Sequence, residues 1–250
     1  MKLLFEIAYL GCAYHGYQVQ ANAPTVQGTL QKALQEFYGV SLMLTGCSRT
    51  DAGVHARSFF LTVEGDLYEN MPYDKIPLAL SRFLPEDIRV LSVRAVPDGF
   101  HPRYDVDYKE YEYLIWNERV SSPFYSGRAW HCPLPLDVDI MNECASHFVG
   151  RKDFAAFMAQ GSPVSSTVRE IKYFYVEKEG SLVKIKVAAD GFLYNMVRIL
   201  SGTLVNVSQR RIALSEIDDI IASLDRKRAG MTLPPDGLYL NKVVYKEGSL

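Results

Sequence analysis

With 250 residues, of which 48% are hydrophobic and 22% charged, the chain has an ordinary globular composition and enough length for one large or two small domains. Its net charge of −2 neither suggests nor excludes a nucleic-acid partner, because a local basic groove can exist on an acidic protein. No apolar stretch approaches the roughly 20 residues that span a bilayer, and Glu6 follows the start too early for a signal peptide, so we expect a cytoplasmic protein.

The first half of the chain combines short strands with two helices. The stretch 11–20 lacks helical periodicity and is expected to form a loop. Thr25 is suited to cap the first helix and Gly39 to end it. The apolar residues of this helix share one face, which comprises Val26, Leu30, Ala33, Leu34 and Phe37. The predicted helices cover residues 25–38 and 73–83, and the predicted strands cover residues 3–9, 41–45, 57–64 and 88–96.

The second half repeats this mixture and begins with a tyrosine-rich strand. The predicted strands cover residues 109–117, 168–177, 182–189 and 241–245. The predicted helices cover residues 137–149, 194–207 and 215–224. Each half therefore interleaves strands with helices, as α+β proteins do.

These elements predict an α+β fold made of two similar, ferredoxin-like sandwich halves. The N-terminal half covers residues 1–104 and the C-terminal half residues 105–250, with the crossover within residues 97–108. We expect the halves to join into one large, mixed and mainly antiparallel sheet with helices on one face. A catalytic cleft is expected between the halves.

Neither the cysteines nor the histidines indicate a metal site. The cysteines are widely separated, at Cys12, Cys47, Cys132 and Cys144, whereas zinc ligands usually occur in closely spaced pairs. The histidines form neither an H-x-x-x-H nor an H-E-x-x-H pattern. We therefore expect four reduced thiols and no metal.

The segment 45–56 concentrates polar and charged side chains between two predicted strands. Arg49 and Asp51 are two residues apart, so they project to the same side of an extended stretch. An arginine beside a carboxylate lowers the pKa of that carboxylate and keeps it ionised. An ionised, positioned carboxylate can act as a covalent nucleophile. The same pattern also suits a tight turn in which the aspartate binds local backbone, and chemistry alone leaves both interpretations open.

Residues 49–56, with the sequence RTDAGVHA, match the signature of the TruA family of tRNA pseudouridine synthases. The chain resembles this family along nearly its whole length, because weaker motifs follow in the family's order. These comprise an opening loop (9–11 and 14–20), a first helix (25–28), a second active-site strand (100–103 and 111–113) and two C-terminal motifs (195–198 and 237–240).

The resemblance implies a role for four residues. Asp51 matches the family's nucleophilic aspartate, and Tyr111 matches its active-site tyrosine, the first of a Tyr-x-Tyr pair. Arg49 matches the arginine that pairs with the aspartate and helps to hold the target base out of the stack. Arg198 matches an arginine near the catalytic pocket. Because Arg198 lies in an otherwise apolar helix, we predict that it pairs with Asp51 or with a substrate phosphate.

The resemblance also implies the reaction. The substrate would be tRNA, with uridines 38, 39 and 40 of the anticodon stem-loop isomerised to pseudouridine after base flipping. The enzyme would be a homodimer that needs no cofactor and no metal.

Two other functions fit parts of the sequence. A retaining glycosidase or nucleosidase would need a second carboxylate about 5 Å from Asp51, and the motif contains no other acid. A catalytically inactive RNA-binding module would be favoured if Asp51 were replaced, but Asp51 is present.

Overall fold

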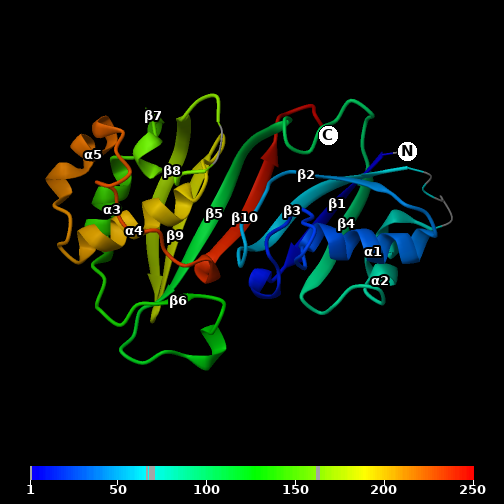
Figure 1. Ribbon diagram of the computed structural model, residues 1–250, viewed down its shortest axis with the longest axis horizontal. Coiled ribbons are helices and arrows are strands. Elements are labelled where there is room, and N and C mark those ends of the chain that lie inside the picture. The colour runs from blue at the N-terminus through cyan, green and yellow to red at the C-terminus, as the bar shows by residue number, and fades with distance from the viewer. Residues whose placement is uncertain (1, 66, 68–70, 162–163) are drawn as a thin grey trace. The chain divides into compact units, whose positions relative to one another are not determined.

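The computed structural model describes residues 2–65, 67, 71–161 and 164–250, and the chain divides into two compact units (Figure 1). Unit 1 extends to Asp107 and also includes Tyr239–Leu250, whereas unit 2 comprises Tyr108–Leu238. The first boundary lies close to the division between residues 104 and 105 that the sequence predicts. The final strand returns to unit 1.

Unit 1 is built on a sheet with the strand order β4-β1-β3-β10, and β2 also pairs with β3. All of these pairs are antiparallel except β3 with β10, where Tyr239 lies opposite His55. The strands are β1 (Lys2–Tyr9), β2 (Met43–Gly46), β3 (His55–Glu64), β4 (Ile88–Ala95) and β10 (Leu238–Tyr245).

Two helices belong to unit 1, and Figure 1 shows them together on one side of its sheet. Helix α1 (Val26–Tyr38) begins as predicted: the Thr25 hydroxyl oxygen accepts a hydrogen bond from the Gly28 N–H at 3.2 Å. It ends at Gly39, whose φ of 72° is left-handed. Helix α2 (Ile76–Leu80) packs against β4 and is shorter than the predicted 73–83, because a 3₁₀ turn precedes it and a non-helical turn follows.

Unit 2 is built on a sheet with the strand order β5-β9-β8-β7, in which all three pairs are antiparallel, and β6 runs parallel to β5. The strands are β5 (Val106–Trp116), β6 (Trp130–His131), β7 (Gly150–Asp153), β8 (Val168–Glu179) and β9 (Leu182–Ala189). In β9, Val183, Ile185 and Val187 are fully buried, whereas Lys184 and Lys186 alternate with them on the opposite face.

Three helices belong to unit 2: α3 (Val138–Ser146), α4 (Met196–Ser208) and α5 (Ile217–Ser223). Helix α3 packs against both β8 and α4. Its N-cap is Asp137, whose carboxylate accepts hydrogen bonds from the Asp139 and Ile140 N–H groups. Helix α4 is buried along most of its length, and each fully buried Leu or Ile side chain contributes about 1.5–3 kcal/mol to folding.

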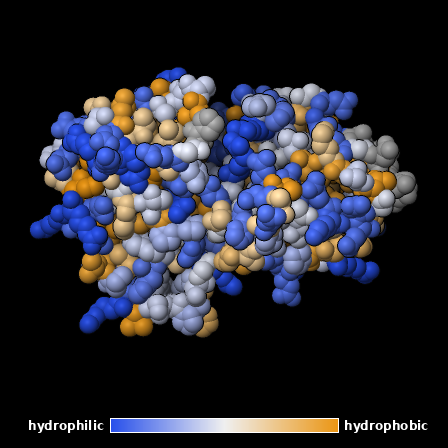
Figure 2. All heavy atoms as spheres, in the orientation of Figure 1, coloured by the Kyte–Doolittle hydropathy of each residue, from blue (hydrophilic) through white to orange (hydrophobic). Residues whose placement is uncertain are grey.

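The predicted α+β fold with mainly antiparallel strands is confirmed within these two units. The four cysteines, all within the described residues, form no disulfide. Figure 2 shows hydrophilic side chains over most of the face in view, with apolar ones in small groups between them. None of the described helices has both the length and the apolar character needed to cross a membrane.

Candidate active site

The loop that carries Asp51 joins β2 to β3, so both of its ends are fixed in the unit 1 sheet. At its start, the buried Cys47 donates its backbone N–H to the Phe60 carbonyl at 2.8 Å. At its end, Val54 donates its N–H to the Asp51 carbonyl at 3.2 Å, which closes a tight turn. A turn therefore forms at Asp51, closed between two backbone groups, and Asp51 is half-buried, so a turn and a catalytic role for this residue are compatible.

Thr50, the residue before Asp51, is buried and bound on two sides. Its hydroxyl is hydrogen-bonded to the hydroxyl of Tyr9 at 2.8 Å. Its carbonyl accepts a hydrogen bond from the Tyr17 N–H at 3.1 Å. These contacts attach the residue next to Asp51 to β1 and to the segment 10–20.

The segment 10–20, which includes most of the opening loop, approaches the loop that carries Asp51 so closely that two positions require glycine. A Cβ at Gly11 would lie 2.1 Å from the Val54 carbonyl oxygen. Gly16 has a φ of +91°, and a Cβ there would lie 2.7 Å from the Thr50 carbonyl oxygen. Backbone therefore packs directly on backbone around the candidate nucleophile.

His55 has a structural role in this loop. It is fully buried, and its Nδ1 accepts a hydrogen bond from the Gly11 N–H at 2.9 Å. Its ring stacks on Tyr239, with 4.5 Å between the ring centroids. Because Nδ1 is an acceptor, the neutral ring carries its proton on Nε2.

Arg49 lies in the same loop but is exposed, and it lines a surface pocket of about 250 Å³. Tyr17, His101, Arg103 and Tyr104 line the same pocket. The pairing of Arg49 with Asp51 stays a prediction.

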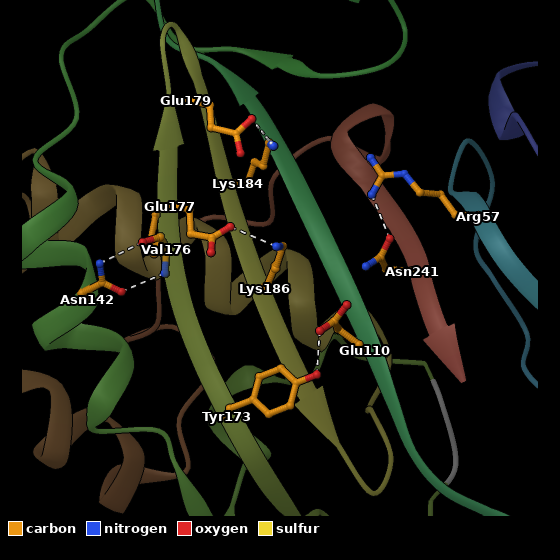
Figure 3. Close-up of polar contacts among 10 residues, drawn as sticks. All are labelled: Arg57, Glu110, Asn142, Tyr173, Val176, Glu177, Glu179, Lys184, Lys186 and Asn241. Atoms are coloured by element: carbon orange, nitrogen blue, oxygen red, sulfur yellow. Dashed lines mark hydrogen bonds and ion pairs between the residues drawn. The ribbon is translucent and has the colours of Figure 1, made fainter. Parts of the chain in front are cut away.

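Tyr111 lies on β5 in unit 2 and is buried, with 7% of its surface exposed. Its ring meets that of Phe192 edge to face, with 5.0 Å between centroids. The neighbouring Glu110 points to the other face of the strand, where Tyr173 donates its hydroxyl hydrogen to a Glu110 carboxylate oxygen at 2.6 Å (Figure 3). Lys186 lies on the same face of the sheet and forms an ion pair with Glu177 at 2.9 Å.

Arg198, at the start of α4, holds the chain near residue 233. Its Nε donates to the Leu233 carbonyl at 2.6 Å, and its Nη1 donates to the Asn195 Oδ1 at 2.8 Å. The next carbonyl, that of Pro234, accepts the hydroxyl hydrogen of Tyr113 at 2.7 Å. Burial raises the pKa of Tyr113, so this phenol stays protonated and remains a donor.

The four predicted residues thus lie at two places in the fold. Arg49 and Asp51 share one loop of unit 1, and Tyr111 and Arg198 belong to unit 2. Sequence reasoning gave no role to Phe192, and it assigned none to the pocket residues Tyr17, His101 and Arg103, although all three fall within segments that resemble family motifs.

Comparison with known proteins supports one family. A family model described as tRNA pseudouridine synthase matches residues 144–246. The tRNA pseudouridine synthase A of a Thermoanaerobacter species is 42% identical over 98% of this chain and 99% of its own length. That of Ruminiclostridium cellulolyticum is 45% identical over 98% of this chain and 99% of its own. A chain of the solved Cbf5-Nop10-Gar1 complex aligns with 97% of this chain and 50% of its own, at 14% identity and a TM-score of 0.37, too low to carry a conclusion.

Proposed function

This chain belongs to the TruA family of tRNA pseudouridine synthases, and we propose that it isomerises uridines 38, 39 and 40 of the tRNA anticodon stem-loop with Asp51 as nucleophile. It is an isomerase that acts on tRNA. The observation that best supports the proposed nucleophile is the fixation of the backbone on both sides of Asp51, by the Thr50 and Val54 contacts, at a residue that is itself half-buried. Groups that react in a fixed geometry need little reorganisation in the transition state.

The reaction starts with extrusion of the target uridine, because its C1′ is inaccessible while the base is stacked. The Asp51 carboxylate then bonds to C1′ of the ribose as the N1–C1′ bond breaks and its electron pair leaves with uracil. This use of a carboxylate resembles the nucleophilic step of retaining glycosidases.

The second stage returns the base to the sugar. Uracil turns, C5 bonds to C1′, and the carboxylate departs. C5 then loses its proton while N1 takes one up. Substrate and product have the same atoms, so the chemistry consumes no second substrate and no oxidant. Water must be kept from C1′, because hydrolysis would leave an abasic site.

Three further side chains have proposed roles in the reaction. Tyr111 stacks on the flipped uracil, a contact worth roughly 1–3 kcal/mol by analogy with other base–aromatic pairs. Arg49 keeps the base out of the stack and holds Asp51 ionised. Arg198 contacts a phosphate of the substrate while it holds the Leu233 backbone.

Unmodified tRNA transcripts in which only one of positions 38, 39 and 40 is uridine test the substrate. We expect the enzyme to form pseudouridine in each transcript, and no free uracil. Release of free uracil would identify a glycosidase instead. Binding of tRNA without any pseudouridine would identify an inactive RNA-binding module, and modification only outside these positions would contradict the proposed site.

We also propose that the enzyme is a cytoplasmic homodimer, with one tRNA contacting both subunits. Light scattering of the purified protein at micromolar concentration should give twice the 28.2 kDa mass of the chain. A mass of 28.2 kDa with full activity would contradict the dimer.

A further inference from the structure

The surface pocket beside Arg49 is built entirely within unit 1, and we call it the Arg49 pocket. Its walls come from the opening loop, from the start of α1, from β2 and the residues after it, and from residues 101–104. Its volume of about 250 Å³ is below the roughly 300–1,000 Å³ of pockets for drug-sized ligands. The pocket is therefore suited to a smaller group, such as a nucleobase or a phosphate.

The charges around the Arg49 pocket favour an anion. Arg49 and Arg103 both line it and both are exposed. Within the described part of the chain, no acidic side chain lines it. Because the guanidinium group presents a planar fork of N–H donors, two arginines at one pocket suit the oxygens of a phosphate.

The same pocket presents an open aromatic ring. Tyr104 is 67% exposed, and its ring centroid lies 4.3 Å from that of His101. The segment that carries these rings is held by its own hydrogen bonds: the Asp105 carboxylate accepts from the His101 N–H at 2.7 Å, and the His101 Nδ1 accepts from the Arg103 N–H at 3.1 Å. These bonds hold the backbone of the segment, while the Tyr104 ring itself is exposed, with the Arg103 guanidinium carbon 5.9 Å from its centroid. An exposed ring beside arginines is a common platform for an unstacked base.

A third observation is the hydroxyl of Tyr17. Tyr17 is 2% exposed and stacks on Phe59 with 4.2 Å between ring centroids. Its hydroxyl oxygen is buried and, within the described residues, has no hydrogen-bond partner. Nearly all buried polar atoms in proteins have a hydrogen-bond partner. Burial also raises the pKa of this phenol, so it stays protonated and remains a donor to a ligand that displaces the atoms now covering it.

We propose that the Arg49 pocket binds a nucleotide that flanks the target uridine, with its phosphate on Arg49 and Arg103, its base against Tyr104, and Tyr17 donating to it. Arg49 is two residues before Asp51, and two residues span at most about 7 Å. The Cα atoms of Arg49 and Asp51 are therefore close, and on this ground the proposal places the nucleotide held here beside the reacting one. This proposal rests on the proposed function and adds a second contact point on the RNA.

The test uses the full chain and an unmodified tRNA transcript. Binding is measured by fluorescence anisotropy over a range of salt concentrations, in an Asp51→Asn background so that no turnover occurs. The variants are Arg103→Ala, Tyr104→Ala and Tyr17→Phe. Two controls match them: Arg82→Ala removes an exposed arginine that does not line the pocket, and Tyr104→Phe keeps the ring.

We expect Arg103→Ala and Tyr104→Ala each to weaken binding about tenfold, whereas Arg82→Ala and Tyr104→Phe bind like the parent. Arg103→Ala should also reduce the slope of log affinity against log salt by about 0.7, the value for one phosphate contact on a single strand. Tyr104→Ala should leave that slope unchanged. Tyr17→Phe should weaken binding about threefold without lowering the thermal unfolding midpoint, because the hydroxyl has no partner within the described protein to lose.

The proposal is overturned if Arg103→Ala and Tyr104→Ala bind tRNA as tightly as Arg82→Ala. An activity assay on the chain with Asp51 intact separates this result from failure of the proposed function. If that chain forms pseudouridine and the pocket variants bind normally, only the pocket assignment is wrong. If it forms none in any tRNA, the function itself is wrong.

Discussion

The side-chain hydroxyls of Tyr9 and Thr50 lie 2.8 Å apart in a buried hydrogen bond. Tyr9 is the last residue of β1, an inner strand of the unit 1 sheet, and Thr50 directly precedes Asp51. The bond therefore connects the loop of the candidate nucleophile to an inner strand of the sheet. Supporting contacts of this kind decide whether a reactive group is held within the small tolerance that catalysis requires.

Replacing Tyr9 by phenylalanine removes this contact and keeps the ring. We expect the free energy of unfolding to fall by about 1–2 kcal/mol, because the buried Thr50 hydroxyl loses a partner. We also expect kcat to fall while KM stays the same, since the change acts on the position of Asp51. Urea unfolding and steady-state kinetics measure the two effects. Thr50→Ser, which keeps the hydroxyl, is the control, and a Tyr9→Phe enzyme with unchanged stability and kcat would rule out the positioning role.

Gly16→Ala should destabilise the fold around the nucleophile loop. The residue has a φ of +91°, and the added Cβ would lie 2.7 Å from the Thr50 carbonyl oxygen. We expect a loss of about 1–3 kcal/mol in the free energy of unfolding. Gly99→Ala is a matched control in the same unit, because a Cβ at Gly99 meets no atom within 4 Å and its φ is not left-handed. Equal stability of the two variants would contradict the close packing described for Gly16.

Arg198→Ala should lower stability as well as activity. The guanidinium donates to the Leu233 carbonyl and to Asn195 Oδ1, and hydrogen bonds from charged groups contribute about 1.5–3 kcal/mol each. We expect the alanine variant to lose about 2–3 kcal/mol, and Arg198→Lys to recover less than half, because a single ammonium group does not reproduce the planar fork. Chemical denaturation and kcat/KM measure both effects. An alanine variant with normal stability and normal turnover would contradict both the structural and the substrate-binding role of Arg198.

Alkylation at pH 8 should label Cys12 selectively. Cys12 is exposed, whereas the other three cysteines are buried. Burial raises the pKa of the Cys144 thiol to about 12, so at pH 8 this thiol stays protonated, and only the thiolate is nucleophilic. Peptide mass spectrometry after brief iodoacetamide treatment should find the label on Cys12, and on Cys144 only after unfolding. Rapid labelling of Cys144 in the native protein would contradict its burial.

The sequence predicted the elements best where local chemistry and burial agree. Helix α1 shows this, because Thr25 at one end, Gly39 at the other and an apolar face between them all indicate the same helix. The sequence did not predict the two-residue strand β6 or the polar strand β7, because neither shows the alternation of apolar and polar residues that indicates a strand. The length of α2 was overestimated for a related reason: of its five residues, only Ile76 and Leu80 are buried, so little tertiary packing extends the helix.

The candidate site was predictable as a motif and not as a structure. The segment 49–56 is distinctive enough in sequence to single out Asp51 as the candidate nucleophile. The contacts that fix it come from residues far along the chain, such as Tyr9, and no local pattern encodes a partner 41 residues away. The Arg49 pocket has the same origin, because residues 101–104 reach it only through the fold.

The role of Asp51 as nucleophile is tested most directly with tRNA that carries tritium at C5 of uracil. The chain with Asp51 intact should release tritium into water and leave no free uracil. Asp51→Asn should unfold at the same temperature, bind tRNA with similar affinity and release tritium at least about a thousandfold more slowly. Release of tritium by Asp51→Asn at the unmutated rate would show that this carboxylate does not carry the reaction.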